Sequence, residues 1–155
     1  MSATPPPSKT GIAIRPARPA DAAGLRQLFA ELGYPATPEH IEDRLAAVLA
    51  KPDHRLLVAA NAGGFLVGAV HAVIIPILES DLTMQIFALV VDPGARRHGV
   101  GRRLTADAEA WGRAQGARVA CLRCNIKRLE AHRFWAAAGY ASTKTQYAFR
   151  KRLDG

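Results

Sequence analysis

A glycine-bearing loop between an apolar strand and a helix constrains this chain more than any other feature. Val90 and Val91 end a strand-like run, an Asp-Pro turn follows, and RRHGVG at residues 96–101 leads into an amphipathic helix. Such a loop presents free backbone N–H groups at a helix N-terminus, where the helix dipole adds partial positive charge. Gly99 and Gly101 tolerate unusual backbone angles and leave those amides accessible to phosphate oxygens. The sequence therefore predicts an anion site, with a plain turn as the alternative.

Arginines around this loop favour a phosphate-bearing ligand, because the guanidinium fork matches phosphate geometry. They are Arg96, Arg97, Arg102 and Arg103. A Walker loop is excluded, since it needs Lys and then Ser or Thr after its second glycine. A dinucleotide-binding fingerprint is excluded as well. It needs a third glycine where Leu104 stands, and an acid at the end of the next strand, where Cys124 and Asn125 stand.

Hydrophobic periodicity predicts an α+β fold that mixes helices and strands along the chain. We expect strands at 11–17, 54–60, 64–76, 82–93, 117–125 and 143–153, and helices at 21–32, 37–51, 100–115 and 131–138. The short connections among the second, third and fourth strands suit antiparallel pairing. The helix that begins at Val100 should then cross over to a parallel strand.

Composition fits a single domain at residues 11–155, since 155 residues with 49% hydrophobic content can build one sizeable core. Residues 1–10 contain three successive prolines and are expected to form a disordered lead-in. No apolar run is long enough to span a bilayer, and the N-terminus lacks the apolar middle of a signal peptide, so a cytoplasmic protein is expected. The formal charge of +8 attracts anions, although scattered arginines also form ordinary solvated surface.

The cysteines and histidines do not form a metal-binding pattern. Cys121 and Cys124 lie three residues apart in a predicted strand, so their side chains should point to opposite faces. They are interpreted as buried or bystander thiols. His98 and His132 have no Cys or His companion at the spacing of metal ligands. We therefore expect no metal.

Two segments together resemble the signatures of the GNAT N-acetyltransferase superfamily. Residues 96–101 fit the R-x-x-G-x-G pattern of its acetyl-coenzyme A loop, and Asn125 with AHRFWAAAGY at 131–140 is similar to its second signature. The resemblance covers residues 12–153 in the family's order of elements. It implies a three-layer α/β/α fold, with a central mixed, mostly antiparallel sheet splayed in a V between the fourth and fifth strands.

The resemblance also implies acetyl-CoA or CoA as the co-substrate. Its diphosphate would lie on the loop amides, and its pantetheine arm would pair like an extra strand with residues 89–91. The binding residues so implied are Leu89, Val90, Val91, Arg96, Arg97, His98, Gly99, Val100, Gly101, Arg102, Asn125 and Phe134. Without the resemblance, Asn125 is equally suited to cap the end of a strand. Phe134 is equally suited to the apolar, core-facing side of its helix.

The implied reaction is direct attack of a primary amine on the thioester, with a backbone N–H near Leu89 or Val90 stabilising the oxyanion. Many relatives carry a Glu where this chain has Phe87, and a thiolate-protonating Tyr where it has Trp135. An indole N–H is no acid, although it can donate a hydrogen bond to sulfur. Candidate replacements, acting directly or through water, are Glu79 and Asp81 in the connector before the central strand, and His71 on the preceding strand. Each also has an ordinary structural interpretation.

Four functions stay open on the sequence alone. An N-acetyltransferase of a small-molecule or protein amine is the preferred hypothesis, and Glu79 and Asp81 would attract a cationic acceptor such as a polyamine, an aminoglycoside or a lysine-like substrate. A non-catalytic acyl-CoA-binding relative is second, because of Phe87 and Trp135. A nucleic-acid-binding domain rests on charge alone and lacks interleaved aromatics, and a structural module leaves both signatures unexplained. A homodimer, formed through the last strand, is expected from the resemblance, with no specific nucleic acid and no membrane as partners.

Overall fold

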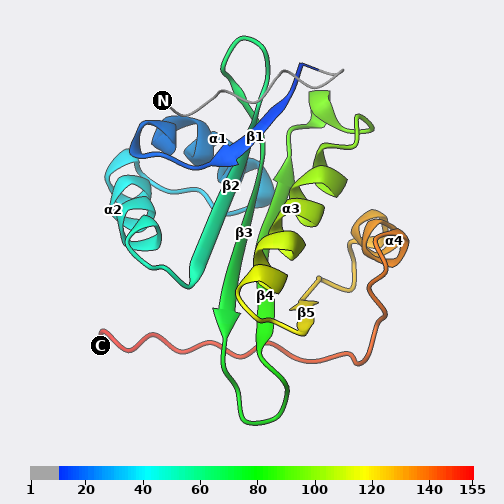
Figure 1. The fold of residues 1–155 in the computed structure, drawn as a ribbon. Coiled ribbons are helices and arrows are strands. Elements are labelled where there is room, and N and C mark those ends of the chain that lie inside the picture. The colour runs from blue at the N-terminus through cyan, green and yellow to red at the C-terminus, as the bar shows by residue number, and fades with distance from the viewer. Residues whose placement is uncertain (1–10) are drawn as a thin grey trace. The chain divides into compact units, whose positions relative to one another are not determined.

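The computed structural model describes residues 11–155, which fall into two compact units with their boundary between Leu122 and Arg123 (Figure 1). The lead-in at 1–10 lies outside the described residues, and the single domain at 11–155 stays a prediction. The first unit contains β1 (Ala13–Pro16), η1 (Pro19–Asp21), α1 (Ala22–Leu32), α2 (Pro38–Leu49), β2 (His54–Ala60), β3 (Leu66–Ile75), β4 (Thr83–Val91), η2 (Pro93–Ala95), α3 (Val100–Ala114) and β5 (Val119–Leu122). The second contains α4 (Leu129–Ala137). Among the described residues, no helix has the length and apolar character needed to cross a membrane.

The sheet of the first unit is mixed, as the sequence predicts. Its strands lie in the order β1-β2-β3-β4-β5. The first four pair antiparallel with their neighbours, and β5 pairs parallel to β4. The parallel pair follows from the crossover through α3, since parallel neighbours need a long connection. The predicted α+β class is confirmed.

The first two helices begin and end at the residues that local chemistry favours. The Thr37 hydroxyl accepts a hydrogen bond from the His40 N–H at 3.1 Å, and Pro38 occupies the first position of α2. α1 ends at Gly33, whose φ of 105° is the left-handed conformation that glycine adopts without steric cost. The start of α2 and the end of α1 are therefore readable from sequence.

The helices cover opposite faces of the sheet, because successive residues of a strand point to opposite sides. On β3, Ala69 is buried in a core cluster with Leu25 of α1 and Leu45 of α2. Its neighbour Gly68 faces α3, where a Cβ would meet Leu104 Cδ1 at 3.0 Å. The first unit thus has three layers, with α1 and α2 on one face and α3 on the other (Figure 1).

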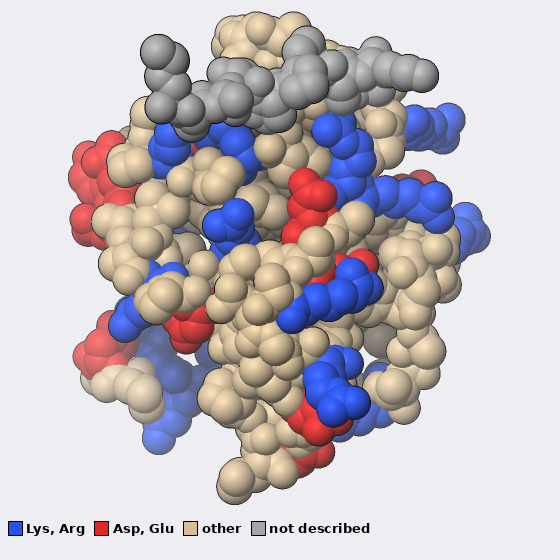
Figure 2. Space-filling model, in the orientation of Figure 1, with Lys and Arg blue, Asp and Glu red and all other residues tan. Residues whose placement is uncertain are grey.

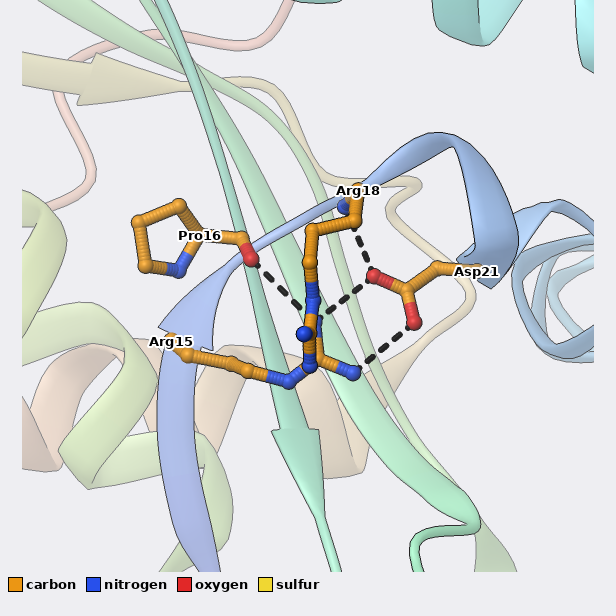
Figure 3. A network of polar contacts seen from close by, with 4 residues as sticks. All are labelled: Arg15, Pro16, Arg18 and Asp21. Carbon is orange, nitrogen blue, oxygen red and sulfur yellow. Dashed lines mark hydrogen bonds and ion pairs between the residues drawn. The ribbon is translucent and has the colours of Figure 1, made fainter. Parts of the chain in front are cut away.

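A partly buried ion pair fastens β1 to the start of α1 (Figure 3). The Arg15 guanidinium donates to both carboxylate oxygens of Asp21, at 2.7 and 2.8 Å, and its Nη1 also donates to the Pro16 carbonyl at 3.2 Å. The Arg18 N–H donates to the same carboxylate at 2.7 Å. The Arg15 hydrogen bond lowers the pKa of Asp21 below its usual value, more than burial raises it. The network therefore connects β1 to the residue that precedes α1.

Asp21→Ala is expected to lower the free energy of unfolding by about 2 kcal/mol at pH 7, because it leaves the Arg15 guanidinium half-buried without its partner. A group with a lowered folded-state pKa stabilises above its unfolded pKa of about 3.9, and that stabilisation is lost as pH falls through the folded value. Urea denaturation of wild type and Asp21→Ala should therefore show a difference in the free energy of unfolding that is constant from neutral pH to about 5 and narrows toward pH 3. A difference in the free energy of unfolding that widens on acidification would contradict the stabilising role of the Arg15–Asp21 pair.

The second unit, residues 123–155, corrects one prediction. α4 spans Leu129–Ala137, close to the predicted helix, but the strand predicted at 143–153 is not formed. Its apolar residues are exposed instead, with Tyr147 at 91%, Phe149 at 92% and Leu153 at 92% exposure. An alternating pattern indicates that a segment can lie on a sheet, but a strand exists only when a neighbouring edge pairs with it. No strand of residues 11–155 pairs with this segment.

Candidate functional site

β4 runs past the end of its parallel neighbour. Pairing with β5 covers Thr83 to Ile86, with Ile86 opposite Leu122. β4 continues to Val91, and over these last residues it pairs with β3 alone among the strands of residues 11–155. The sheet is therefore open between β4 and β5 beyond Ile86, as the predicted V requires. Residues 89–91, the predicted pantetheine edge, lie in this portion, which is paired with β3 but not with β5.

A β-bulge lies just inside the opening. His71 pairs with Ala88 while the next residue, Ala72, pairs with Ile86, so Phe87 is the extra residue. A bulge bends its strand and redirects the backbone groups beside it, and bulges are enriched next to active sites. The Phe87 side chain is 56% exposed. The position where many relatives carry a Glu is thus a bulged, exposed aromatic.

The loop after β4 has two left-handed residues in close succession. The Asp92 carboxylate accepts from the Gly94 N–H at 3.1 Å and so begins the short η2 turn. Arg97 then has φ 70° and Gly99 has φ 74°. Arg97 is the one non-glycine residue with positive φ among the described residues. Alternation of this kind turns successive N–H groups to one side and forms an anion-binding concavity.

The loop opens directly onto the N-terminus of α3. Gly99 is the N-cap and has no side chain to cap the helix, and its carbonyl accepts the Arg103 N–H at 3.0 Å. The amides of the first turn have no acceptor within a helix, so they remain available to an anion. Arg96, Arg97 and Arg102 are exposed, and basic side chains gather where α3 begins (Figure 2). Arg103 points elsewhere, donating to the Ile12 carbonyl at 3.2 Å.

Arg97→Gly is expected to raise the free energy of unfolding by up to about 1 kcal/mol, because glycine removes the steric cost of the left-handed backbone. The same change should weaken binding of CoA or inorganic pyrophosphate, since one loop charge is lost. Arg97→Lys, which keeps both the charge and the strain, is the matched control. If calorimetry shows that Arg97→Gly binds pyrophosphate as tightly as wild type does, the Arg97 side chain does not contact the anion.

The predicted carboxylates lie at the other end of β4. Glu79 and Asp81 are exposed in the connector between β3 and β4, and the Asp81 carbonyl accepts from the Thr83 hydroxyl at 2.9 Å. Asp81 precedes Phe87 by six residues, which corresponds to roughly 20 Å of extended strand. The structure therefore does not bring these carboxylates to the bulge, and their catalytic role stays a prediction.

The predicted residues of the second signature belong to the second unit. The side-chain oxygen of Asn125 accepts a hydrogen bond from the Lys127 N–H at 2.9 Å. The backbone carbonyl of Asn125 accepts one from His132 Nε2 at 2.8 Å. Phe134 and Trp135 meet edge to face, with ring centroids 4.9 Å apart. Trp135 also meets Tyr140 edge to face, at 5.2 Å. Asn125 thus forms the turn before α4, and Trp135 lies between two aromatic rings.

The candidate His71 lies beside the bulge and is paired with His54, a partner that sequence reasoning did not identify. His54 Nδ1 and His71 Nε2 lie 3.0 Å apart, although the residues are separated by 17 positions. Burial, and then the nearby His54, lower the pKa of His71 to about 4. The His71 ring also lies 6.0 Å from that of Phe87. His71 interrupts the apolar strand β3, but His54 is the first residue of β2, and nothing in the sequence indicates that the two rings meet.

The remaining candidate ligands are the two cysteines. Cys121 and Cys124 are half-buried cysteines outside any disulfide, and Cys124 lies just beyond β5. Within residues 11–155 there is no group of three or more His, Cys, Asp or Glu side chains arranged to hold a metal ion.

The comparisons with known proteins agree with the open sheet and glycine loop. The model of the Acetyltransferase (GNAT) family matches residues 22–140. This chain therefore belongs to the GNAT acetyltransferase family, which confirms the resemblance noted in the sequence.

Individual relatives match different shares of the chain. An aminoglycoside N(6')-acetyltransferase type 1 from Stenotrophomonas maltophilia is 30% identical over 145 residues, or 91% of this chain and 94% of that protein. An aminoalkylphosphonate N-acetyltransferase from Salmonella typhimurium is 41% identical over 69 residues, or 44% of each chain. Among solved structures, the aminoglycoside N-acetyltransferase AAC(6')-Iy in complex with CoA has a TM-score of 0.83 at 20% identity, covering 95% of this chain and 99% of that chain. This last likeness shows a shared fold.

Proposed function

We propose that this protein is an N-acetyltransferase that moves an acetyl group from acetyl-CoA to a primary amine by direct attack. One observation carries the proposal. The end of β4, which β5 leaves unpaired on one side, leads through a loop with two left-handed residues into the N-terminus of α3. A strand edge and an anion cradle are thereby joined, which suits a ligand with an extended amide-bearing arm and a diphosphate.

Acetyl-CoA is the proposed co-substrate, and the residues present fit it. The backbone amides of 97–101 would hold the diphosphate, and the exposed guanidinium groups of Arg96, Arg97 and Arg102 would neutralise its charge. The backbone of 89–91 would pair with the pantetheine arm. Leu89 and Val90 lie two and three residues after the bulged Phe87, so an N–H there can be aimed at a developing oxyanion. Following the family resemblance, Asn125 and Phe134 are proposed to contact the pantetheine, and no metal takes part.

The acceptor is proposed to be a cationic small-molecule amine. Two relatives are named for acetylating aminoglycosides and aminoalkylphosphonates, both of which carry an amine. Glu79 and Asp81 would attract such a cation to the connector by charge rather than act at the reacting atoms. A protein amine is the alternative acceptor.

The departing thiolate needs a proton or a hydrogen bond, and Trp135 is proposed to supply the latter. Its indole N–H donates without releasing a proton, so the thiolate would take its proton from water. The second candidate function, a non-catalytic acyl-CoA-binding protein, is favoured by the absence of an ionisable side chain at Phe87 and of a phenol at Trp135.

A homodimer in the cytoplasm is proposed as the working form, without specific nucleic-acid or membrane partners. Its support is the C-terminal segment, where Tyr147, Phe149 and Leu153 are almost fully exposed. Large apolar side chains that are exposed together on one segment are typical of a surface that another chain covers. Sedimentation of the full chain would distinguish a dimer from a monomer.

The function is tested by supplying acetyl-CoA with a panel of aminoglycosides, polyamines, aminoalkylphosphonates and lysine peptides. Release of free thiol above a blank without acceptor, with one acetyl group added to the amine by mass, is the expected result. Tight CoA binding without thiol release for any amine would instead support the non-catalytic alternative.

A further inference from the structure

The two histidines of the pair lie on neighbouring strands of the sheet, β2 and β3. His54 is the first residue of β2, and His71 pairs across the ladder with Leu56, two residues further along β2. Residues in this diagonal relation share a face, so the two rings lie side by side. Their centroids are 5.2 Å apart with a 30° tilt, and Nδ1 of His54 is 3.0 Å from Nε2 of His71. The pair shares one hydrogen bond, in which one ring donates and the other accepts.

The pair lies next to the backbone where the reaction is proposed to occur. His71 is the cross-strand partner of Ala88, so their Cβ atoms are roughly 5 Å apart. Ala88 directly precedes Leu89, and its other neighbour is the bulged Phe87. The His71 ring lies 6.0 Å from the Phe87 ring, with a 37° tilt. His71 is therefore closer along the sheet to the proposed thioester position than the carboxylates of the connector are.

One ring nitrogen of His71 is left for a substrate. Nε2 is occupied by His54, and among residues 11–155 the Nδ1 atom of His71 has no hydrogen-bond partner. We propose, on the basis of the N-acetyltransferase function proposed above, that His71 takes the proton of the attacking amine at Nδ1 and passes a proton to His54. The pair would thus take over the role of the carboxylate that is absent at Phe87.

The proton transfer balances across the pair. In the productive tautomer His71 carries its proton on Nε2 and donates it to Nδ1 of His54, which carries its own proton on Nε2. As the amine nitrogen bonds to the acetyl carbon, its N–H proton moves to His71 Nδ1. The Nε2 proton of His71 moves to His54 Nδ1, and the Nε2 proton of His54 moves to water. Both rings end neutral in the opposite tautomer, and exchange with water restores the first.

Burial explains why two histidines serve better than one. The lowered pKa of His71 means that its ring is neutral at physiological pH and can accept a proton, but holds a positive charge poorly. Transfer to His54 removes that charge from the buried position. His54 follows three exposed residues, Lys51 to Asp53, and is itself half-buried at the start of β2, so solvent can reach this member of the pair.

The test uses the full chain with an amine on which the wild type turns over. His71→Gln and His54→Gln should each lower kcat about 100-fold, because a positioned proton acceptor contributes at least that factor, while KM for acetyl-CoA stays unchanged. The double variant should lose no more than either single variant, since groups that act as a unit are not additive. In His71→Ala, added imidazole should restore part of the lost kcat, which a purely structural histidine would not show. His40→Gln, an exposed histidine on α2, is the matched control and should keep the wild-type kcat.

The outcomes separate this inference from the function on which it rests. Wild-type turnover with kcat retained in His71→Gln and His54→Gln overturns the relay and leaves the acetyltransferase function standing. Wild-type protein that binds CoA but acetylates no amine overturns both. Melting curves accompany each variant. If His71→Gln unfolds, His54→Gln decides the matter, because it removes the relay partner at the partly exposed start of β2.

Discussion

Gly99→Glu is expected to weaken CoA binding at least about 100-fold, equivalent to about 2.7 kcal/mol of binding free energy. Two effects add in the same direction. Gly99 has φ 74°, so any side chain strains the backbone that forms the anion cradle. The new carboxylate would also lie beside the diphosphate. Within residues 11–155, and apart from Gly99 and its two chain neighbours, no atom lies within 4 Å of the position that a Cβ would take at Gly99, so this part of the fold has room for the side chain.

Two matched variants divide these effects. Gly99→Ala introduces the backbone strain alone and should weaken binding less. Gly33→Glu places the same charge at another left-handed glycine with open space, φ 105°, at the end of α1, and should leave CoA affinity unchanged. Calorimetry gives the affinities. At a hundredfold excess over its dissociation constant, CoA should stabilise wild type by about 2.7 kcal/mol and Gly99→Glu far less. Equal affinity in a folded Gly99→Glu would place CoA elsewhere.

Gly68→Val is expected to lower the free energy of unfolding by about 3 kcal/mol, the second large effect. A Cβ at Gly68 would meet Leu104 Cδ1 at 3.0 Å, Val100 Cγ1 at 3.1 Å and the Val90 carbonyl oxygen at 3.1 Å. The carbonyl belongs to the β3–β4 ladder and cannot move aside without breaking it. α3 would therefore have to move away from the sheet, beginning at the end that carries the anion cradle.

Gly63→Val is the control for this change. Its Cβ would meet the ring of Phe65 at 3.3 Å, and that ring is 74% exposed and free to turn. Denaturant unfolding should show a loss well under half of that for Gly68→Val. If Gly68→Val costs less than about 1 kcal/mol, the close packing of α3 on β3 is not what positions the helix.

Much of the fold was predictable because its signals are local. The cap at Thr37, the stop at Gly33 and the glycine loop before α3 each depend on a few neighbouring residues. The left-handed conformation of Gly99 follows from the same local chemistry. That of Arg97 does not, since arginine rarely adopts it and only the surrounding loop imposes it.

The parts that could not be predicted depend on pairing between distant segments. The bulge at Phe87 is set by the register of β4 against β3, which the alternation of β4 alone does not reveal. The His54–His71 contact needs the register of β2 against β3. The last predicted strand failed for the same reason, because an alternating segment such as that around Tyr147 carries no information on which edge it pairs with.

Nuclear magnetic resonance of isotope-labelled protein titrated with CoA tests most directly whether the opening of the sheet and the glycine loop form the acetyl-CoA site. The largest chemical shift changes of backbone amides should occur at residues 97–101, at the start of α3, and at 89–91, where β4 extends beyond β5. The connector at 77–81 should change little. Saturable CoA binding with the largest shifts outside 89–101 would contradict the proposed site.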